Sequence, residues 1–274
     1  MPTFLGKAFN TYFKNILHVN QSSNTGVDAT TRTIQDGAGN DSVLSLSDDN
    51  LLIKPVNDNT IGTLSVQNAS GNSLMIVDST NSKVLLGTSQ TAANTQYVYF
   101  GAVYVDASIA GFTADTHYAI PFMMGNFDAV TASYAMGSST SSSFNDTNPA
   151  SSLTISDTAH SIIRCYWYVM DDITIDAVKW WHGADTATGD TNAAHLMAYT
   201  VATVSGATDG DLSSGVVVAD GSNIANQGYE QAHFQQMTIQ SADVDAGKVI
   251  LFTFASDTVN SDYSINATVK YHIR

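Results

Sequence analysis

The stretch DGAGND at residues 36–41 is the first place where residue types and spacing could do chemistry. With the residues that follow, it comes within one position of the nonapeptide G-G-x-G-x-D-x-U-x, which binds calcium in repeated parallel β-helices. Such sites need consecutive nonapeptides because each ion lies between successive turns of the repeat. We find one copy and interpret it as a tight turn, in which glycine supplies positive φ and Asp or Asn hydrogen-bonds the backbone.

The segment WWHGADTATGD at residues 180–190 contains a second set of candidate ligands, His182, Asp185 and Asp190. One imidazole and two carboxylates on a loop fall short of a zinc site, and the sequence has no His-Glu-x-x-His, cysteine pair or EF-hand string. A serine nucleophile would need an elbow such as G-x-S-x-G, which the serine-rich segments lack. We therefore expect no metal, no cofactor and no catalytic residue.

Two aspartates could still serve as the acid and base of a glycoside hydrolase. Glu230 is the only glutamate, and the aspartates are scattered through turn segments without a pair that stands out. Aspartate favours turns whereas glutamate favours helix interiors, so this skew indicates many short strands joined by tight turns.

Adjacent tryptophans offer a candidate binding surface. Trp180 and Trp181 lie in a predicted strand, so their side chains should point to opposite faces, one into the core and one outward. The outward ring is either a sugar-stacking platform or a subunit contact, since aromatic residues concentrate at such contacts. The segment GYEQAHFQ presents the same two alternatives. The residues concerned are Trp180, Trp181, His182, Tyr229, His233 and Phe234.

The composition indicates an all-β protein. Charged residues make up 13% of the 274 residues and hydrophobic residues 43%, and Ser, Thr, Asn, Gly and Asp fill most of the remainder. Cys165 is the only cysteine, so no intrachain disulfide can form, and we expect it to be a small buried apolar residue.

Charge and hydropathy argue against two classes of partner. The formal net charge of −15 disfavours contact with nucleic acid phosphates. No segment reaches the roughly 18 apolar residues of a membrane span, and the first residues do not resemble a secretory signal. We expect a soluble chain with no membrane span.

The first zone of the chain predicts an amphipathic helix. Apolar residues recur at helical spacing through residues 4–19, and we assign residues 1–20 to an anchor helix followed by an extended linker at 21–36. Lys7 and Lys14 are the only lysines there, which favours a protein socket or an oligomer contact over a membrane surface. The predicted contact residues are Phe4, Leu5, Phe9, Tyr12, Phe13, Ile16 and Leu17.

The second zone, residues 37–96, is a train of short predicted strands separated by turn signals. Each strand offers only two or three large apolar residues, too few to close a core in one chain. Identical chains wound around a common axis would share these residues and cover the strand edges. The predicted core of this shaft is Leu44, Leu46, Leu64, Val66, Ile76, Val84 and Leu86.

The third zone, residues 97–274, carries nearly all the aromatic residues and about ten strand candidates. This pattern predicts a β-sandwich head of jelly-roll type. Alternation is clearest near the C-terminus, where Ile265, Ala267, Val269, Tyr271 and Ile273 should share one face. The expected fold is therefore an N-terminal amphipathic helix, a short oligomeric β shaft and a jelly-roll-like head.

Three segments carry a resemblance to a known class of protein: NTGVDATTRTIQDGAGN, IVDSTNSKVLLGTSQ and IQSADVDAGKVILFTFASDTVNSDYSINATVKYHIR. With them the chain resembles structural fibre and decoration proteins of marine tailed bacteriophages. The second segment is similar to the collar sequences of trimeric phage fibres. The resemblance implies a homotrimeric component of the virion with an N-terminal anchor and a C-terminal head.

These observations lead to a functional expectation. We expect a non-enzymatic virion protein, assembled in the host cytoplasm and exposed on the particle, that binds other virion proteins through its N-terminal helix. Its head would contact the host surface, including glycans, as part of a tail fibre. The alternatives are a capsid decoration protein that stabilises the head of the particle, a polysaccharide depolymerase, and a carbohydrate-binding module.

Overall fold

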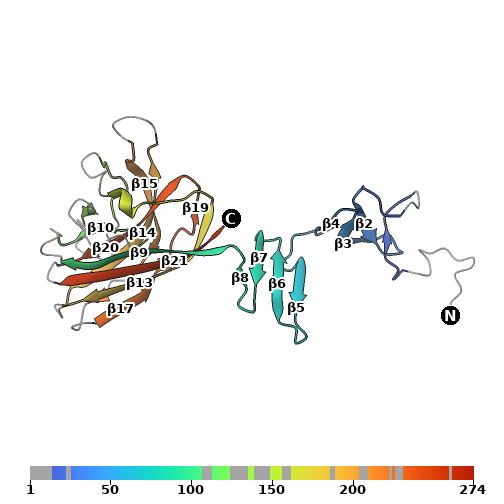
Figure 1. Ribbon diagram of the computed structural model, residues 1–274, viewed down its shortest axis with the longest axis horizontal. Coiled ribbons are helices and arrows are strands. Elements are labelled where there is room, and N and C mark those ends of the chain that lie inside the picture. Colours follow the sequence, from blue (N-terminus) through green and yellow to red (C-terminus); the bar gives the residue numbers. More distant parts are fainter. Residues whose placement is uncertain are drawn as a thin grey trace, which may run out of the picture. The chain divides into compact units, whose positions relative to one another are not determined.

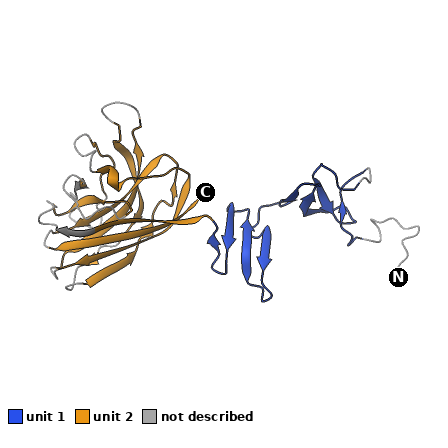
Figure 2. Cartoon of the chain, in the orientation of Figure 1, with its two compact units in different colours: residues 1–93 blue, residues 94–274 orange. Residues whose placement is uncertain are grey.

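The chain folds into antiparallel sheets in two compact units, residues 1–93 and residues 94–274 (Figure 2). The computed structural model describes residues 14–22, 26–106, 113–123, 135–138, 149–155, 162–185, 189–203, 209–221, 224–225, 231–258 and 261–274. Within these ranges the helical residues are Ile162 and the 3-10 turn that follows it, Ile163–Cys165. The expectation of an all-β protein is confirmed.

The predicted N-terminal helix does not extend to residue 19. Lys14 and Asn15 form a turn, and His18–Val19 form strand β1, which pairs with Arg32–Gln35, strand β2. The β-branched Val19 lies opposite Ile34 in this pair, and a helix here would leave one edge of β2 unpaired. Phe4, Leu5, Phe9, Tyr12 and Phe13 lie outside the described residues.

The first unit contains two four-stranded sheets, each a meander in which sequential strands are neighbours (Figure 1). The first sheet holds β1, β2, β3 (Asp41–Leu46) and β4 (Leu51–Ile53). The second holds β5 (Leu64–Gln67), β6 (Ser73–Asp78), β7 (Lys83–Leu86) and β8 (Thr91–Ala92). All the pairings are antiparallel and lie within one chain.

The two sheets repeat with a period of 32 residues, the interval from Arg32 to Leu64 and from Asp41 to Ser73. Each repeat runs from a four-residue strand through a five-residue loop to a six-residue strand. The sequences at the loops are QDGAGN and QNASGN. This repeat was not predicted, because only Gln, Gly and Asn recur at identical places in these six residues.

The repeated loops close by the same chemistry. The carboxylate of Asp36 accepts hydrogen bonds from the backbone N–H groups of Ala38 and Asn40, at 2.8 and 2.9 Å. In the second loop the side-chain oxygen of Asn68 accepts from the N–H groups of Ser70 and Asn72, at 3.0 and 2.9 Å. The fourth loop residue is a glycine with positive φ, 87° in the first loop and 81° in the second. DGAGND is therefore a tight turn, as predicted.

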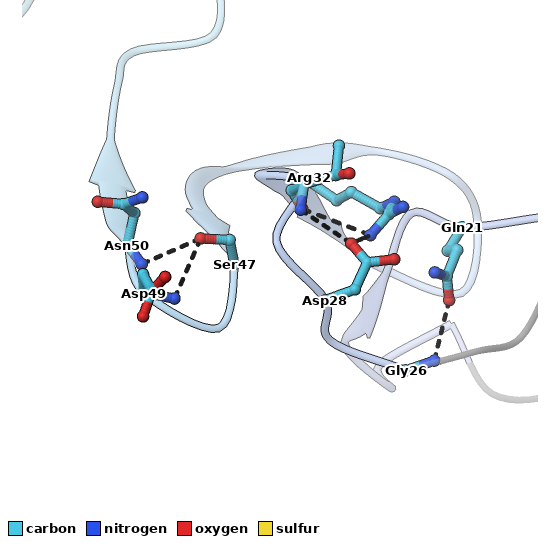
Figure 3. Close-up of polar contacts among 8 residues, drawn as sticks. Gln21, Gly26, Asp28, Arg32, Ser47, Asp49 and Asn50 are labelled. Atoms are coloured by element: carbon cyan, nitrogen blue, oxygen red, sulfur yellow. Dashed lines mark hydrogen bonds and ion pairs between the residues drawn. The ribbon is translucent and has the colours of Figure 1, made fainter.

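Polar side chains also fix the neighbouring connections of the first sheet (Figure 3). The hydroxyl of Ser47 accepts hydrogen bonds from the N–H groups of Asp49 and Asn50, at 3.3 and 3.0 Å, which closes the turn between β3 and β4. Arg32 forms an ion pair with Asp28, and this hydrogen bond lowers the pKa of the Asp28 carboxyl to about 2. The side chains replace backbone partners that these turns do not provide.

The second unit is built from two larger antiparallel sheets. The strands of one sheet are β10 (Thr116–Ile120), β11 (Ala135–Ser138), β12 (Trp167–Tyr168), β14 (Thr191–Val201), β15 (Leu212–Asp220), β16 (Ile224–Ala225), β18 (Thr238–Ile239) and β20 (Lys248–Ser256). The strands of the other are β9 (Thr95–Asp106), β13 (Ile173–Ala184), β17 (Gln231–Gln236), β19 (Asp243–Val244) and β21 (Asp262–Ile273).

The spatial order of the strands differs from their order in the chain. The first sheet runs β11-β10-β20-β14-β15-β18, with β12 on β20 and β16 on β14. The second runs β17-β13-β21-β9, with β19 on β13, and Figure 1 shows these long strands side by side. The last strand, β21, lies between β13 and β9 and pairs with both.

The two sheets pack face to face as a β-sandwich. The ring centroids of Trp180 on β13 and Phe254 on β20 are 6.1 Å apart, and those of Phe100 on β9 and Phe252 on β20 are 6.0 Å apart. Aromatic and aliphatic side chains of both sheets form one hydrophobic cluster between them. The predicted alternation in β21 holds for residues 265, 267, 269 and 271, which are buried, but not at the end of the strand, where His272 is buried and Ile273 only partly so.

The adjacent tryptophans give a matched test of this packing. Trp180 is 0% exposed and Trp181 is 45% exposed. We expect Trp180→Ala to lower the free energy of unfolding by about 3–5 kcal/mol, because it opens a cavity between the sheets. Trp181→Ala should cost less than about 1 kcal/mol. Urea unfolding followed by circular dichroism measures both, and equal losses would contradict the assignment of the two faces.

Candidate interaction surfaces

The predicted aromatic cluster divides between the two faces of the sheet formed by β17, β13, β21 and β9. Trp181 and Phe234 lie opposite each other on the outer face, with ring centroids 4.5 Å apart and planes tilted by 46°. The ammonium of Lys179 lies 5.7 Å from the centroid of Phe234. Trp180 and His182 face the core, and Tyr229 lies outside the described residues.

The inward side chains belong to a buried polar cluster at one end of the sandwich. His182 stacks on Trp180 at 5.0 Å and on His233 at 4.8 Å. The amide nitrogen of Asn192 lies 3.2 Å from Nε2 of His182. Which of the two groups donates depends on the tautomer of the His182 ring, and Nδ1 of His182 and Oδ1 of Asn192 are buried without a hydrogen-bond partner.

The same end of the core contains a second polar contact. The hydroxyl of Tyr263 donates to a carboxylate oxygen of Asp190 at 2.7 Å. The hydroxyl of Ser256 lies 3.3 Å from the hydroxyl oxygen of Tyr263. Burial raises the pKa of Tyr263. His182 and Asp190, two of the candidate ligands, are thus buried, whereas Asp185 accepts a hydrogen bond from the backbone N–H of Asp262 at 2.9 Å.

These residues are poorly arranged to chelate an ion. The rings of His182 and His233 are stacked with only 21° between their planes, so their in-plane lone pairs cannot converge on one point. In the described ranges no three His, Cys, Asp or Glu side chains are grouped to hold a metal. The arrangement can stabilise neutral histidines in the core.

A second histidine pair lies elsewhere in the sandwich. The rings of His117 and His195 meet edge to face at 4.8 Å, and both residues are buried. Cys165 is also buried, as predicted, and burial raises the pKa of its thiol to about 12, so it stays protonated and unreactive at neutral pH.

The sheets of the first unit present uncovered aliphatic faces. In the sheet of β5 to β8, Leu64 and Val66 share one face with four residues of β6 and β7. The register aligns this set as two cross-strand rows: Leu64, Val77 and Val84 in one, and Val66, Met75 and Leu86 in the other. Val66 is 41% and Leu86 46% exposed. Four predicted shaft residues therefore lie together.

The remaining shaft residues lie on other surfaces. Ile76 points to the opposite face of the same sheet, across from Leu85. Leu44 and Leu46 share a face of the first sheet with Leu51 and Ile53. Ile34, at 8% exposure, is the only apolar side chain buried among the described residues of this unit.

The sequence analysis overlooked two further aromatic residues, Tyr97 and Tyr99 on β9. Both are exposed, and they align with Lys270 and Thr268 on the outer face of the sheet. Tyr97 also borders a groove of about 460 Å³ that is lined by Trp167, Tyr168 and other side chains. The alternation of tyrosine with valine in QYVYFGAVYV was the signal that could have revealed this face.

No protein-family model matches the chain, and no curated protein matches it either. Within the described ranges, no helix has the length and apolar character to cross a membrane.

The buried histidines make stability depend on pH. Burial lowers the pKa of His182 to about 3, with a smaller contribution from His233, and lowers that of His195 to about 4. The unfolded chain binds these protons near pH 6.5, so it binds more protons than the folded chain below that pH. The stabilisation is complete above pH 6.5 and is lost as pH falls towards 4.

We expect the free energy of unfolding to fall by about 1.4 kcal/mol per pH unit for each of these two histidines between pH 6 and 4. Urea unfolding of the full chain at several pH values measures the slope. His182→Gln should remove about half of it, and His18→Gln, at an exposed position, should leave it unchanged. An unaltered slope in His182→Gln would contradict the assignment.

Proposed function

We propose that this chain is a non-enzymatic structural protein of a tailed bacteriophage virion. It forms a homotrimeric, fibre-like appendage that is anchored through its N-terminal segment and contacts the host surface with its second unit. The resemblance of three sequence segments to phage fibre and decoration proteins supports the virion assignment. The structure supports the oligomeric part of the proposal through one observation.

That observation is that aliphatic side chains on the sheets of the first unit are exposed to solvent in a single chain. The rows formed by Leu64, Val77 and Val84 and by Val66, Met75 and Leu86 face solvent in a single chain. Apolar surface gains about 25 cal/mol for each Å² removed from water, so these rows favour association. Identical copies provide matching faces, and closed symmetry covers all of them at once.

The strand order of the second unit supports a jelly-roll head. Its eight longest strands, in chain order, are β9, β10, β13, β14, β15, β17, β20 and β21. Numbered one to eight, they form sheets with the orders 2-7-4-5 and 6-3-8-1. This is the order of an eight-stranded jelly roll, an architecture used by viral capsid and lectin domains. A head of this kind suits contact with a surface.

The alternatives differ in place or in activity. A capsid decoration protein would use the same trimer to stabilise the head of the particle. A polysaccharide depolymerase would release reducing ends from host glycan, and a carbohydrate-binding module would fold as a monomer. Labelled antibody on intact virions separates tail from capsid, and a reducing-end assay with the purified protein separates binding from cleavage.

The oligomeric state is tested with two matched variants. We expect light scattering to give three times the chain mass for the full protein. Leu86→Lys places a charge on the uncovered face and should shift the protein towards monomer at micromolar concentration. Ser70→Lys adds the same charge in the exposed loop between β5 and β6 and should leave the trimer intact.

Two results would contradict the proposal. A monomeric wild-type protein would remove the oligomer, since the uncovered rows would then be stable in water. Absence of antibody labelling on any part of the virion would remove the placement, whatever the mass.

A further inference from the structure

The outer face of the sheet β17-β13-β21-β9 combines exposed rings with polar side chains. Three cross-strand rows follow from the register. They are Phe234, Trp181, Asn266 and Gly101; Gln236, Lys179, Thr268 and Tyr99; and Ala177, Lys270 and Tyr97. The rings of Phe234 and Trp181 lie on the β17 side, and those of Tyr97 and Tyr99 lie on the β9 edge. Hydroxyl, amide and ammonium groups lie between them.

This mixture suits a carbohydrate better than a purely apolar partner. Each ring offers a flat apolar surface, and Tyr adds a polar tip. The hydroxyl of Thr268 and the carboxamide of Gln236 are short-range donors and acceptors for sugar hydroxyls. Four strands span roughly 15 Å, since neighbouring strands lie about 4.8 Å apart, which accommodates several units of an extended polymer.

The charge on this face has the opposite sign to that of the whole chain. The chain carries 25 acidic against 10 basic residues. In the three rows the charged side chains are Lys179 and Lys270, and both are positive. Asp176 on β13 and Asp185 just after it lie outside these rows, and the carboxylate of Asp176 lies 3.0 Å from Nδ1 of His272.

The contact between Lys179 and Phe234 keeps one ammonium beside the exposed ring pair. An anionic sugar that stacks on Trp181 would therefore meet a positive charge at short range. A second copy presenting the same face would bring like charges together, which disfavours pairing of this face with itself.

We propose that this outer face binds an acidic polysaccharide, with Trp181 and Phe234 as the stacking pair and Lys179 and Lys270 as the anionic anchors. The inference rests on the proposed contact with the host surface and names the chemistry of that contact. The acid group can be a carboxylate, a sulfate or a phosphodiester, because all three offer anionic oxygens to an ammonium.

The test uses the full-length protein and three anionic polymers: polygalacturonate, heparin and a phosphodiester-linked teichoic acid. Fully methyl-esterified polygalacturonate and dextran are the neutral controls. Biolayer interferometry should show binding to at least one anionic polymer at least about tenfold tighter than to the neutral ones. Raising NaCl from 50 to 500 mM should weaken it, since exposed charges are screened.

Variants locate the site. Trp181→Ala and the double variant Lys179→Gln, Lys270→Gln should each weaken binding about tenfold or more, equivalent to about 1.4 kcal/mol. Val216→Ala shortens an exposed apolar side chain on β15, in the other sheet of the same unit, and Lys83→Gln removes a positive charge from the first unit; both should bind as the wild type does. The double variant Lys179→Arg, Lys270→Arg should retain binding.

Three outcomes would overturn the inference: no binding to any of the anionic polymers, equal binding to the methyl ester, or a change of oligomeric mass in Trp181→Ala. The last result would assign the face to a contact between copies. None of them bears on antibody labelling of the virion, so the inference can fail while the proposed function stands. Binding to an anionic polymer without antibody labelling of the virion would support the inference and contradict the proposed placement on the virion.

Discussion

A β-sheet has two faces, and a stable sheet in water must cover at least one of them with apolar contacts. The second unit meets this requirement within one chain, because Trp180, Phe252 and Phe254 fill the space between two sheets. The first unit satisfies the hydrogen bonds of its strands in the same chain but not the cover of their faces. The difference between the two units explains why one is a self-contained sandwich and the other points to partners.

The same requirement accounts for the distribution of polar groups. In the sandwich, His182, Asn192 and Asp190 are buried. Keeping His182 neutral in the core costs stability at low pH, which a large apolar core can offset. The first unit has no comparable core, so its polar side chains are used at turns, where Asp36, Ser47 and Asn68 close hairpins.

The sequence predicts features that depend on local pattern. Period-two alternation correctly placed Ile265, Ala267 and Val269 in the core, and it placed the two tryptophans on opposite faces. Turn chemistry identified the loop at Asp36. Each of these depends only on residues within a few positions, and tertiary contacts do not override them.

Features that depend on distant partners were missed. The helical spacing up to residue 19 is overridden by pairing of Val19 with Ile34, and His272, on the predicted polar face of its strand, is buried and contacts Asp176, far away in the chain. Tyr97 and Tyr99 join Trp181 on one face only through β21, whose register no local pattern gives. The 32-residue repeat escaped notice because its period is carried by loop geometry more than by identical residues.

The central position of β21 governs the order in which the molecule can form during synthesis. Thr95 at the start of β9 pairs with His272, so closing that ladder requires contacts between the two extremes of the unit. Until β21 is synthesised, β9 and β13 each expose an unsatisfied edge, while the meanders of the first unit can already fold from neighbouring residues. The growing chain therefore carries unpaired strand edges until its last strand is made, and such edges make a partly folded chain prone to aggregation.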